Sequence, residues 1–338
     1  MLVIKEIHAP EFLDELLAFS CQVFGANSYQ TDPKYYNWLY KLNPFAKRLD
    51  CCAAFDGSEL VGVIHKMRLP LGGENSGRMI ACLHNHIVKT DARAGVGFML
   101  LKKAQKHEFS VFAPGVSGKT KLLYKNLNFS EIKTSWQVKP LAPLKLSWQI
   151  LRSSLWSPKN ANNSFPKPSV VSSNKGMTAT LVPSEAQIDR ISSFLNNDID
   201  RGLSNTISVL WTCELVRWRF FSDIGPKHLL VHDQEMSRFA VVSLGSKSGV
   251  RVARLILISS NDSSVLVTQI GKIARQFGAT LFMGYSQDAN LTSGLAKARW
   301  KERRIETSGY FINQLGKSLN GGAPITDFGF ESLQAVYL

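Results

Sequence analysis

A strand-like apolar run over 79–88 is followed by a short turn that carries Gly95 and Gly97, and then by an amphipathic helix. Glycines at such a junction let backbone N–H groups approach an anion, because no Cβ stands in the way. The partial positive charge at the start of the helix then favours a phosphate there. The helix is expected to place Phe98, Leu101 and Ala104 on its apolar face. The junction predicts a phosphate cradle, although the same pattern also occurs as an ordinary strand-to-helix loop.

The length of the chain, 338 residues, favours two domains, because single hydrophobic cores stop growing at about 250–300 residues. Hydrophobic residues make up 44% and charged residues 20% of the chain, as in a soluble globular protein. No apolar run approaches the length of about 20 residues that a membrane-spanning helix needs, and no signal peptide is expected. The five cysteines show neither an even count nor C-x-x-C spacing. We therefore expect no disulfide framework, no metal site and a cytoplasmic location.

The formal net charge of +14 raises the question of a nucleic-acid partner. The basic residues are scattered along the chain, however, and no stripe of Lys and Arg interleaves with aromatic residues. Helix-turn-helix, zinc-finger and RNA-recognition signatures are also missing from the sequence. We therefore expect no nucleic-acid partner. A small polyanion, such as a nucleotide or a coenzyme with phosphates, would account for local basic clusters equally well.

The order of predicted elements indicates an α+β fold in which mixed sheets carry flanking helices. Strands and helices alternate in the first half, which includes a predicted β-hairpin over 51–67. The second half repeats this order loosely, and Trp38 and Trp218 lie in equivalent predicted helices. The expected organisation is a first domain over 1–140, a linker over 141–180 and a second domain over 181–338.

The linker contains a predicted basic amphipathic helix at 144–156, within a stretch from 132 to 184 that has no acidic side chain. A helix of this kind can lie on an anionic membrane. It can also serve as a connector that packs on one of the two domains. We favour the connector, so membrane contact is not expected.

Three short motifs resemble those of the GCN5-related N-acetyltransferase (GNAT) superfamily. Residues 92–97, Ala-Arg-Ala-Gly-Val-Gly, are similar to its acyl-CoA loop, Q/R-x-x-G-x-G/A. Residues 123–129, Leu-Tyr-Lys-Asn-Leu-Asn-Phe, resemble the recurrent L-Y-x-x-L-G-F near the end of the fold. Residues 38–44 resemble a W-x-Y-x-x-N-P segment of acyltransferase-like proteins. Ala92 departs from the first motif, and Asn128 replaces the Gly of the second, although Asn tolerates the left-handed conformation of a helix end.

The resemblance implies that an acyl-CoA co-substrate is held at the glycine turn. The pyrophosphate would lie on backbone N–H groups at the start of the helix. The main chain of the preceding strand would face the pantetheine arm and the thioester. The implied coenzyme-binding residues are Ile87, Val88, Arg93, Ala94, Gly95, Val96, Gly97, Phe98, Ser117 and Tyr124.

Acyl transfer from a thioester to an amine also requires groups that move protons. By its place in the second motif, Tyr124 is the candidate acid for the departing thiolate, although it could equally be a buried core aromatic. His84 and His86 are candidates for accepting the amine proton, because imidazole titrates near neutral pH. Strand alternation is expected to put both on one face. A histidine in a strand is more often structural, and the amine could also lose its proton to water.

The second half has no comparable loop, because its segment at 260–264 is acidic and lacks Gly-x-Gly. Tandem GNAT folds with a degenerate second copy resemble the sugar N-acyltransferases of nucleotide-sugar biosynthesis. This resemblance implies that a deoxyamino sugar linked to a nucleotide, dTDP, accepts the acyl group. Two alternatives stay open, an aminoacyl or peptidyl transferase of cell-wall precursors and a non-catalytic membrane-associated protein. An oligomer is compatible with all three.

Overall fold

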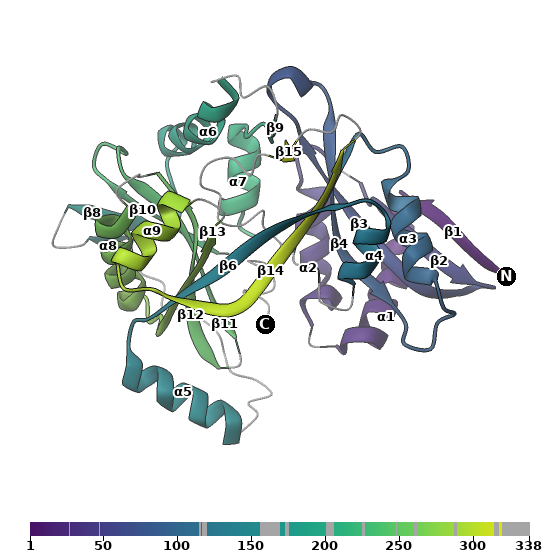
Figure 1. Ribbon diagram of the computed structural model, residues 1–338, viewed down its shortest axis with the longest axis horizontal. Coiled ribbons are helices and arrows are strands. Elements are labelled where there is room, and N and C mark those ends of the chain that lie inside the picture. Colours follow the sequence, from purple (N-terminus) through teal and green to yellow (C-terminus); the bar gives the residue numbers. More distant parts are fainter. Residues whose placement is uncertain are drawn as a thin grey trace. The chain divides into compact units, whose positions relative to one another are not determined.

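The computed structural model of the chain describes two compact units (Figure 1). Unit 1 includes the described residues within Met1–Ile132, Asn196–Trp218 and Ser308–Asn320, and unit 2 includes those within Lys133–Leu195 and Arg219–Thr307. Within the described part of the chain, no helix is long and apolar enough to span a bilayer. The described residues are 1–26, 28–46, 48–114, 116, 120–155, 170–172, 176–200, 206–224, 227–247, 249–259, 263–286, 289–313 and 318–319.

Unit 1 contains a mixed sheet in the order β1-β2-β3-β4-β5-β14. Its strand pairs are antiparallel except for the parallel pair of β4 and β5. The predicted hairpin is confirmed as β2 and β3, and Gly57 at its tip has a φ of 61°, a conformation that suits glycine. The strands are β1 (Leu2–Ile7), β2 (Cys51–Asp56), β3 (Glu59–Pro70), β4 (Met79–Val88), β5 (Ser110–Ala113) and β14 (Lys301–Asn313).

Helices α3 and α4 pack on one face of this sheet and bury a core that includes Leu100, Ala104 and Tyr124. The predicted helix that contains Trp38 begins where Asp32 accepts a hydrogen bond from the backbone N–H of Lys34. It then changes from an α-helix to a π-helix, a form that is frequent at functional sites. The helical elements are η1 (Pro10–Phe12), α1 (Leu13–Phe24), η2 (Tyr29–Thr31), α2 (Pro33–Tyr36), the π-helix η3 (Asn37–Lys41), η4 (Gly73–Asn75), α3 (Val96–Gln105) and α4 (Lys121–Asn126).

Unit 2 contains a second mixed sheet in the order β6-β13-β12-β11-β10-β8-β7, in which only β12 and β13 are parallel. Its core packs α8 and α9 against the sheet. The strands are β6 (Ser130–Pro140), β7 (Val170–Ser172), β8 (Met177–Thr180), β10 (His228–Asp233), β11 (Phe239–Lys247), β12 (Val250–Ile258) and β13 (Leu281–Ser286). The helices of unit 2 are α5 (Pro143–Leu155), α8 (Ser263–Gln276) and α9 (Ala289–Lys297). Helix α6 (Glu185–Asp200) begins in unit 2 and ends in unit 1, whereas α7 (Cys213–Phe221) begins in unit 1 and ends in unit 2. A small separate sheet in unit 1 pairs β9 (Thr206–Ile207) with β15 (Ser318–Leu319).

The two units repeat one order of elements, which confirms the α+β class with a duplicated unit. In each, a long strand leads to a helix and then to a parallel neighbour, as in β4-α3-β5 and β12-α8-β13. The path of the chain was not predictable from the sequence. Strand β6 starts in unit 1 and pairs with β13 in unit 2, whereas β14 starts in unit 2 and pairs with β5 in unit 1. Each sheet is thus completed by a strand from the other half of the sequence.

Candidate active site

Strands β4 and β5 separate where the predicted site lies. Their parallel pairing is limited to Ala81 with Val111 and Cys82 with Phe112. Beyond Cys82, no strand of the described chain pairs with β4 on its β5 side. The main-chain edge over 83–88 is therefore not used by a neighbouring strand. Such an edge can hydrogen-bond to an extended ligand.

A β-bulge interrupts this open stretch. The register of β3 and β4 shifts between Val63 and His65, so that β4 contributes one residue more than β3. Asn85 has a φ of 45°, in the left-handed region that Asn tolerates better than most residues. Its Nδ2 donates a hydrogen bond to the Tyr35 hydroxyl at 3.1 Å. Bulges re-aim the side chains that follow them and are frequent beside active sites.

The bulge directs His84 and His86 to opposite faces of the sheet, so the prediction that they share a face is wrong. His84 stacks on His65 of β3, with ring centroids 5.3 Å apart. His86 instead faces Gly97 of α3 and Tyr124 of α4, and the His86 and Tyr124 ring centroids are 6.4 Å apart. The expected alternation of side chains fails because the extra residue in the bulge places every later side chain of β4 on the opposite face of the sheet.

Burial keeps these imidazoles neutral. It lowers the pKa of His65 to about 3. It lowers the pKa of His84 well below the usual value, and the neighbouring His65 adds to this shift. It lowers the pKa of His86 to about 4, against a smaller opposing contribution from the backbone of Gly97. Neither buried ring nitrogen of His86 makes a hydrogen bond of normal geometry within the described residues, and a neutral imidazole nitrogen can accept a proton.

The glycine turn leads into α3, as predicted. Gly95 is the N-cap residue and has a φ of 91°, a conformation that side-chain-bearing residues rarely adopt. The N–H of Val96 donates to the carbonyl of Arg93 at 3.4 Å. The N–H groups of Ala94, Gly95 and Phe98 have no acceptor in the part of the chain that the structure describes. Together with the dipole of α3, these N–H groups form a cradle that suits a phosphate.

Two side chains at the cradle, those of Arg93 and Phe98, are open to solvent. Arg93 is exposed, so its guanidinium group can approach a bound anion. Leu101 and Ala104 are buried as predicted, whereas Phe98 is 36% exposed and lies at the rim of the cradle. Val96, at 1% exposed, takes the core position instead. The first turn of α3 therefore offers both N–H groups and an apolar ring to a ligand.

Tyr124 is fixed by the way α4 ends. The N–H of Phe129 donates to the carbonyl of Tyr124 at 3.1 Å, and the N–H of Asn128 donates to that of Lys125 at 3.0 Å, which is a Schellman motif. Asn128 has a φ of 63°, so its predicted left-handed conformation is confirmed. The Tyr124 ring packs edge-on against Phe129, with centroids 5.1 Å apart. Burial raises the pKa of Tyr124, so the hydroxyl is protonated at neutral pH and can act as a proton donor.

Most of the predicted site residues thus surround one place, where β4 ends and α3 begins. Residues 87–88 lie on the open edge, residues 93–98 form the cradle, and His86 and Tyr124 lie beside them. His84 lies apart on the other face, and Ser117 lies outside the described residues. No group of three or more His, Cys, Asp or Glu side chains in the described ranges is arranged to hold a metal ion.

Sequence reasoning missed Tyr35 and His65, which contact the bulge and His84. Besides its bond with Asn85, the Tyr35 hydroxyl is 3.4 Å from Nδ1 of His84. The aromatic helical segment that contains Tyr35 has a pattern that is also typical of helices packed in a core, and Tyr35 is 1% exposed. The sequence therefore holds no signal that would separate a role at the bulge from a role in the core.

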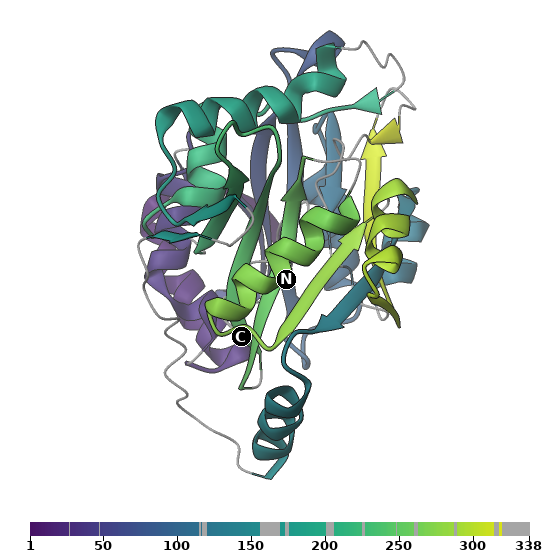
Figure 2. The same ribbon diagram turned by 90° about the vertical axis from the view of Figure 1, so that its left-hand side faces the viewer.

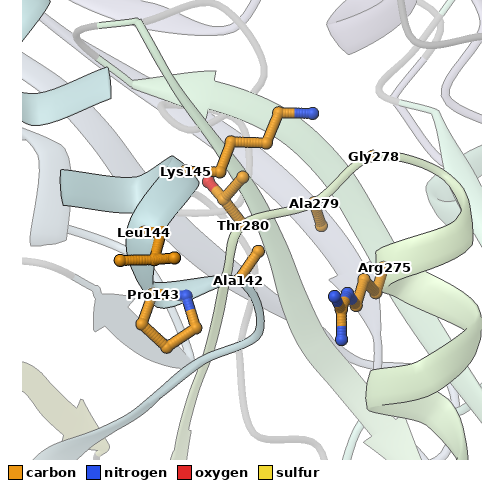
Figure 3. Close-up of a pocket in the computed structure, with 8 residues that line it drawn as sticks. All are labelled: Ala142, Pro143, Leu144, Lys145, Arg275, Gly278, Ala279 and Thr280. Atoms are coloured by element: carbon orange, nitrogen blue, oxygen red, sulfur yellow. The ribbon is translucent and has the colours of Figure 1, made fainter. Parts of the chain in front are cut away.

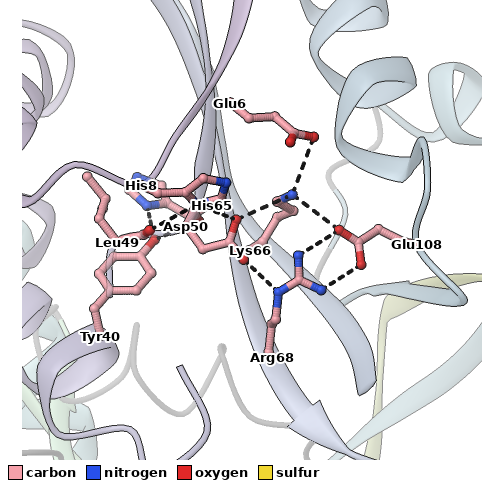
Figure 4. Close-up of polar contacts among 9 residues, drawn as sticks. All are labelled: Glu6, His8, Tyr40, Leu49, Asp50, His65, Lys66, Arg68 and Glu108. Atoms are coloured by element: carbon pink, nitrogen blue, oxygen red, sulfur yellow. Dashed lines mark hydrogen bonds and ion pairs between the residues drawn. The ribbon is translucent and has the colours of Figure 1, made fainter. Parts of the chain in front are cut away.

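A buried charge cluster in unit 1 includes none of the predicted site residues (Figure 4). Nζ of Lys66 lies 3.3 Å from Asp50 and 3.2 Å from Glu108, and Arg68 donates to Asp50 at 2.7 Å and to both oxygens of Glu108 at 2.7 and 2.9 Å. Burial lowers the pKa of Lys66, but Asp50 and Glu108 offset this effect and raise it above the usual value. Because the opposite charges neutralise one another, we assign the cluster a structural role.

The sequence matches no protein-family model and no curated protein. The structure is similar to N-myristoyltransferase from Saccharomyces cerevisiae with bound myristoyl-CoA and inhibitors, with a TM-score of 0.59 and 11% identity over 96% of this chain and 85% of that chain. A putative acetyltransferase from Pyrococcus horikoshii is similar with a TM-score of 0.54 and 12% identity, over 97% of this chain and 95% of that chain. A GCN5-related N-acetyltransferase from Anabaena variabilis is similar with a TM-score of 0.53 and 11% identity, over 92% of this chain and 72% of that chain. These similarities show that the chain has the tandem GNAT fold, with the glycine loop in its first copy only.

Proposed function

We propose that the chain is an N-acyltransferase that moves an acyl group from acyl-CoA to an amine. The observation that carries the proposal is the open edge of β4 beyond Cys82, which ends at the N–H groups of α3. An extended pantetheine arm can hydrogen-bond along this edge while its pyrophosphate lies in the cradle. The structurally similar yeast N-myristoyltransferase holds myristoyl-CoA, which supports an acyl-CoA co-substrate here.

In the proposed reaction, the amine nitrogen attacks the thioester carbon, a C–N bond forms and the C–S bond breaks. Main-chain N–H groups of the open edge polarise the thioester carbonyl. Tyr124 is protonated, and its ring lies against His86, which faces Gly97 of the cradle, so Tyr124 gives its proton to the departing thiolate. A neutral imidazole takes the proton that the amine loses. His86 is on the Tyr124 side and His84 is on the other, so the side from which the acceptor approaches selects between them.

For the acceptor we propose a deoxyamino sugar linked to a nucleotide, most simply dTDP. The resemblance of residues 38–44 to acyltransferase-like proteins supports this class, and the net charge of +14 suits a diphosphate-bearing substrate. The second copy lacks the glycine loop, so we expect one acyl-CoA per chain. We place the reaction in the cytoplasm because the odd number of cysteines without paired spacing fits a reducing compartment.

The test is a thiol-release assay with several acyl-CoAs against dTDP- and UDP-linked amino sugars. We expect release that depends on both substrates, together with an upward thermal shift on addition of coenzyme A. A chain that neither shifts with any CoA ester nor releases thiol is not an acyl-CoA enzyme. Aminoacyl transfer from charged tRNA without acyl-CoA would identify the cell-wall transferase instead. A thermal shift on addition of coenzyme A without acyl transfer to any sugar would support coenzyme binding and contradict the proposed acceptor.

A further inference from the structure

Helix α5 presents an apolar stripe to solvent. Leu144, Trp148 and Leu151 are 90%, 63% and 50% exposed, and their spacing of four and three residues puts them on one face of the helix. The opposite side of α5 faces the rest of unit 2, where Oε1 of Gln149 accepts a hydrogen bond from the Thr280 hydroxyl at 2.6 Å. Figures 1 and 2 both show α5 extending from the rest of unit 2. The helix is therefore docked on one side and bare on the other.

The charges beside the stripe all have one sign. Lys145 and Arg152 are exposed and seven residues apart, so they lie on the same flank of the stripe. Neither has an ion-pair partner among the residues that the structure describes. The sequence from 132 to 184 has no acidic side chain that could reduce this positive potential. The pattern is that of a helix that lies in the plane of an anionic surface.

A pocket at the start of α5 extends the positive surface (Figure 3). Its volume is about 390 Å³, and its charged lining residues within the described ranges are Lys145 from α5 and Arg275 from the end of α8. Leu144, the first residue of the apolar stripe, lines the same pocket. Cationic groups and apolar groups thus meet at one edge of the surface. This combination matches a phosphate-bearing lipid headgroup whose acyl chains continue beside it.

We propose that α5 binds the surface of an anionic lipid bilayer. Leu144, Trp148 and Leu151 enter the boundary between headgroups and acyl chains, where an exposed tryptophan is favoured because its ring is amphipathic. Lys145 and Arg152, with Arg275 at the pocket, contact lipid phosphates. A protein partner would be expected to need a broader apolar patch than a stripe of three side chains. Charge of one sign along the stripe favours lipid over a second copy of this chain, which would repel itself there.

The test is co-sedimentation of the full chain with vesicles of phosphatidylcholine alone and of phosphatidylcholine mixed with phosphatidylglycerol. We expect binding to the mixed vesicles that weakens as salt rises, and little binding to the neutral ones. Leu151→Glu should reduce binding by at least about tenfold, because it places a negative charge in the stripe. Val182→Glu is the matched control, since Val182 is 83% exposed in unit 2 but lies outside α5.

A second pair of variants tests the charges separately. Lys145→Glu combined with Arg152→Glu should also reduce binding at least about tenfold, because each basic residue near the surface contributes to attraction. Arg190→Glu, at an exposed position of α6, should bind like the wild type. Wild-type unfolding profiles for all variants would show that the fold is kept.

Three outcomes would overturn the proposal. The first is a wild-type chain that does not sediment with the mixed vesicles, and the second is equal binding to both vesicle types. The third is equal loss of binding in Leu151→Glu and Val182→Glu. A shift in size on gel filtration that Leu151→Glu abolishes, without vesicle binding, would assign the stripe to a second copy of the chain. None of these measurements depends on acyl transfer.

Discussion

Trp38 and Trp218 are 180 residues apart in the sequence, yet their indole rings stack in unit 1 and each donates to the other's backbone. The ring centroids are 4.9 Å apart at an interplanar angle of 15°. The indole N–H of Trp38 donates to the carbonyl of Trp218 at 3.1 Å, and that of Trp218 donates to the carbonyl of Trp38 at 2.7 Å. The two helices predicted to be equivalent are therefore joined by a reciprocal contact at their equivalent residues.

We expect Trp218→Phe to lower the free energy of unfolding by about 1–3 kcal/mol, because it keeps an aromatic ring but removes the buried hydrogen bond from the indole N–H of residue 218 to the carbonyl of Trp38. Urea denaturation measures the change. Trp148→Phe, at an exposed position, should change the same quantity by less than about 0.5 kcal/mol. The double variant with Trp38→Phe should lose less than the sum of the two single variants, since the contacts are shared. Strict additivity would contradict a coupled pair.

Gly97→Glu should weaken coenzyme A binding by at least about 100-fold, because a carboxylate next to the cradle repels the pyrophosphate. Gly97→Ala is the matched control. A Cβ at this position would lie 3.4 Å from Nε2 of His86 and 3.6 Å from Cγ2 of Val88, which are ordinary contacts. The alanine variant should therefore fold and retain most of its affinity. Calorimetric titration with coenzyme A separates the two, and wild-type affinity in Gly97→Glu would place the coenzyme elsewhere.

Tyr124→Phe should lower kcat by about 100-fold, which is the typical contribution of a positioned acid, and should leave coenzyme binding nearly unchanged. Because burial raises the pKa of Tyr124, the wild-type kcat should not fall through its ionisation until the pH exceeds about 10. Leu122→Ala, on the same helix and 67% exposed, is the control for a general effect on α4. If Tyr124→Phe lowers stability but leaves kcat intact, the tyrosine is a core residue only.

Glu108→Gln should destabilise the protein by about 3–5 kcal/mol, because it leaves the buried Lys66 and the partly buried Arg68 with too little negative charge. The surface pair of Lys89 and Glu59 provides the comparison, with its charged atoms 2.5 Å apart and Glu59 64% exposed. Glu59→Gln should cost no more than about 1 kcal/mol. Chemical denaturation of both variants at one pH measures the difference. Equal losses would mean that burial does not strengthen the inner cluster.

Acid should destabilise the fold through its buried histidines. Their pKa values are lowered in the folded state, so between pH 6.5 and about 4 the unfolded chain binds protons that folded His86 does not. For His65 this window extends to about pH 3. The free energy of unfolding should therefore fall as the pH falls through this range, by about 1.4 kcal/mol per histidine for each pH unit crossed within its window. Denaturation midpoints measured from pH 7 to pH 4 test the sign.

His65→Asn should flatten this acid slope while lowering stability at neutral pH, because it removes one buried imidazole together with its stacking on His84. His107→Asn, at an exposed residue with a φ of 71° that Asn tolerates, is the matched control for the substitution itself. An unchanged slope in His65→Asn would assign the acid sensitivity to other groups.

Short-range sequence patterns account for the local features of the site. Gly95 and Asn128 adopt the left-handed conformations that their residue types allow, and the strand-turn-helix around Gly97 forms as predicted. These features depend on backbone preferences within a few residues, so short motifs carry them. The repeated order of elements and the α+β class follow from hydrophobic periodicity for the same reason.

How these parts combine depends instead on contacts between distant segments, which no local pattern encodes. The bulge at Asn85 sends His84 and His86 to opposite faces, because it arises from pairing with β3 rather than from the sequence of β4 alone. The placement of β6 and β14 depends on strands that are distant in sequence. The exposure of the stripe on α5 likewise depends on which side of the helix unit 2 covers. The sequence of a helix or strand determines which of its faces can be buried, whereas contacts between distant segments determine which elements pack against that face.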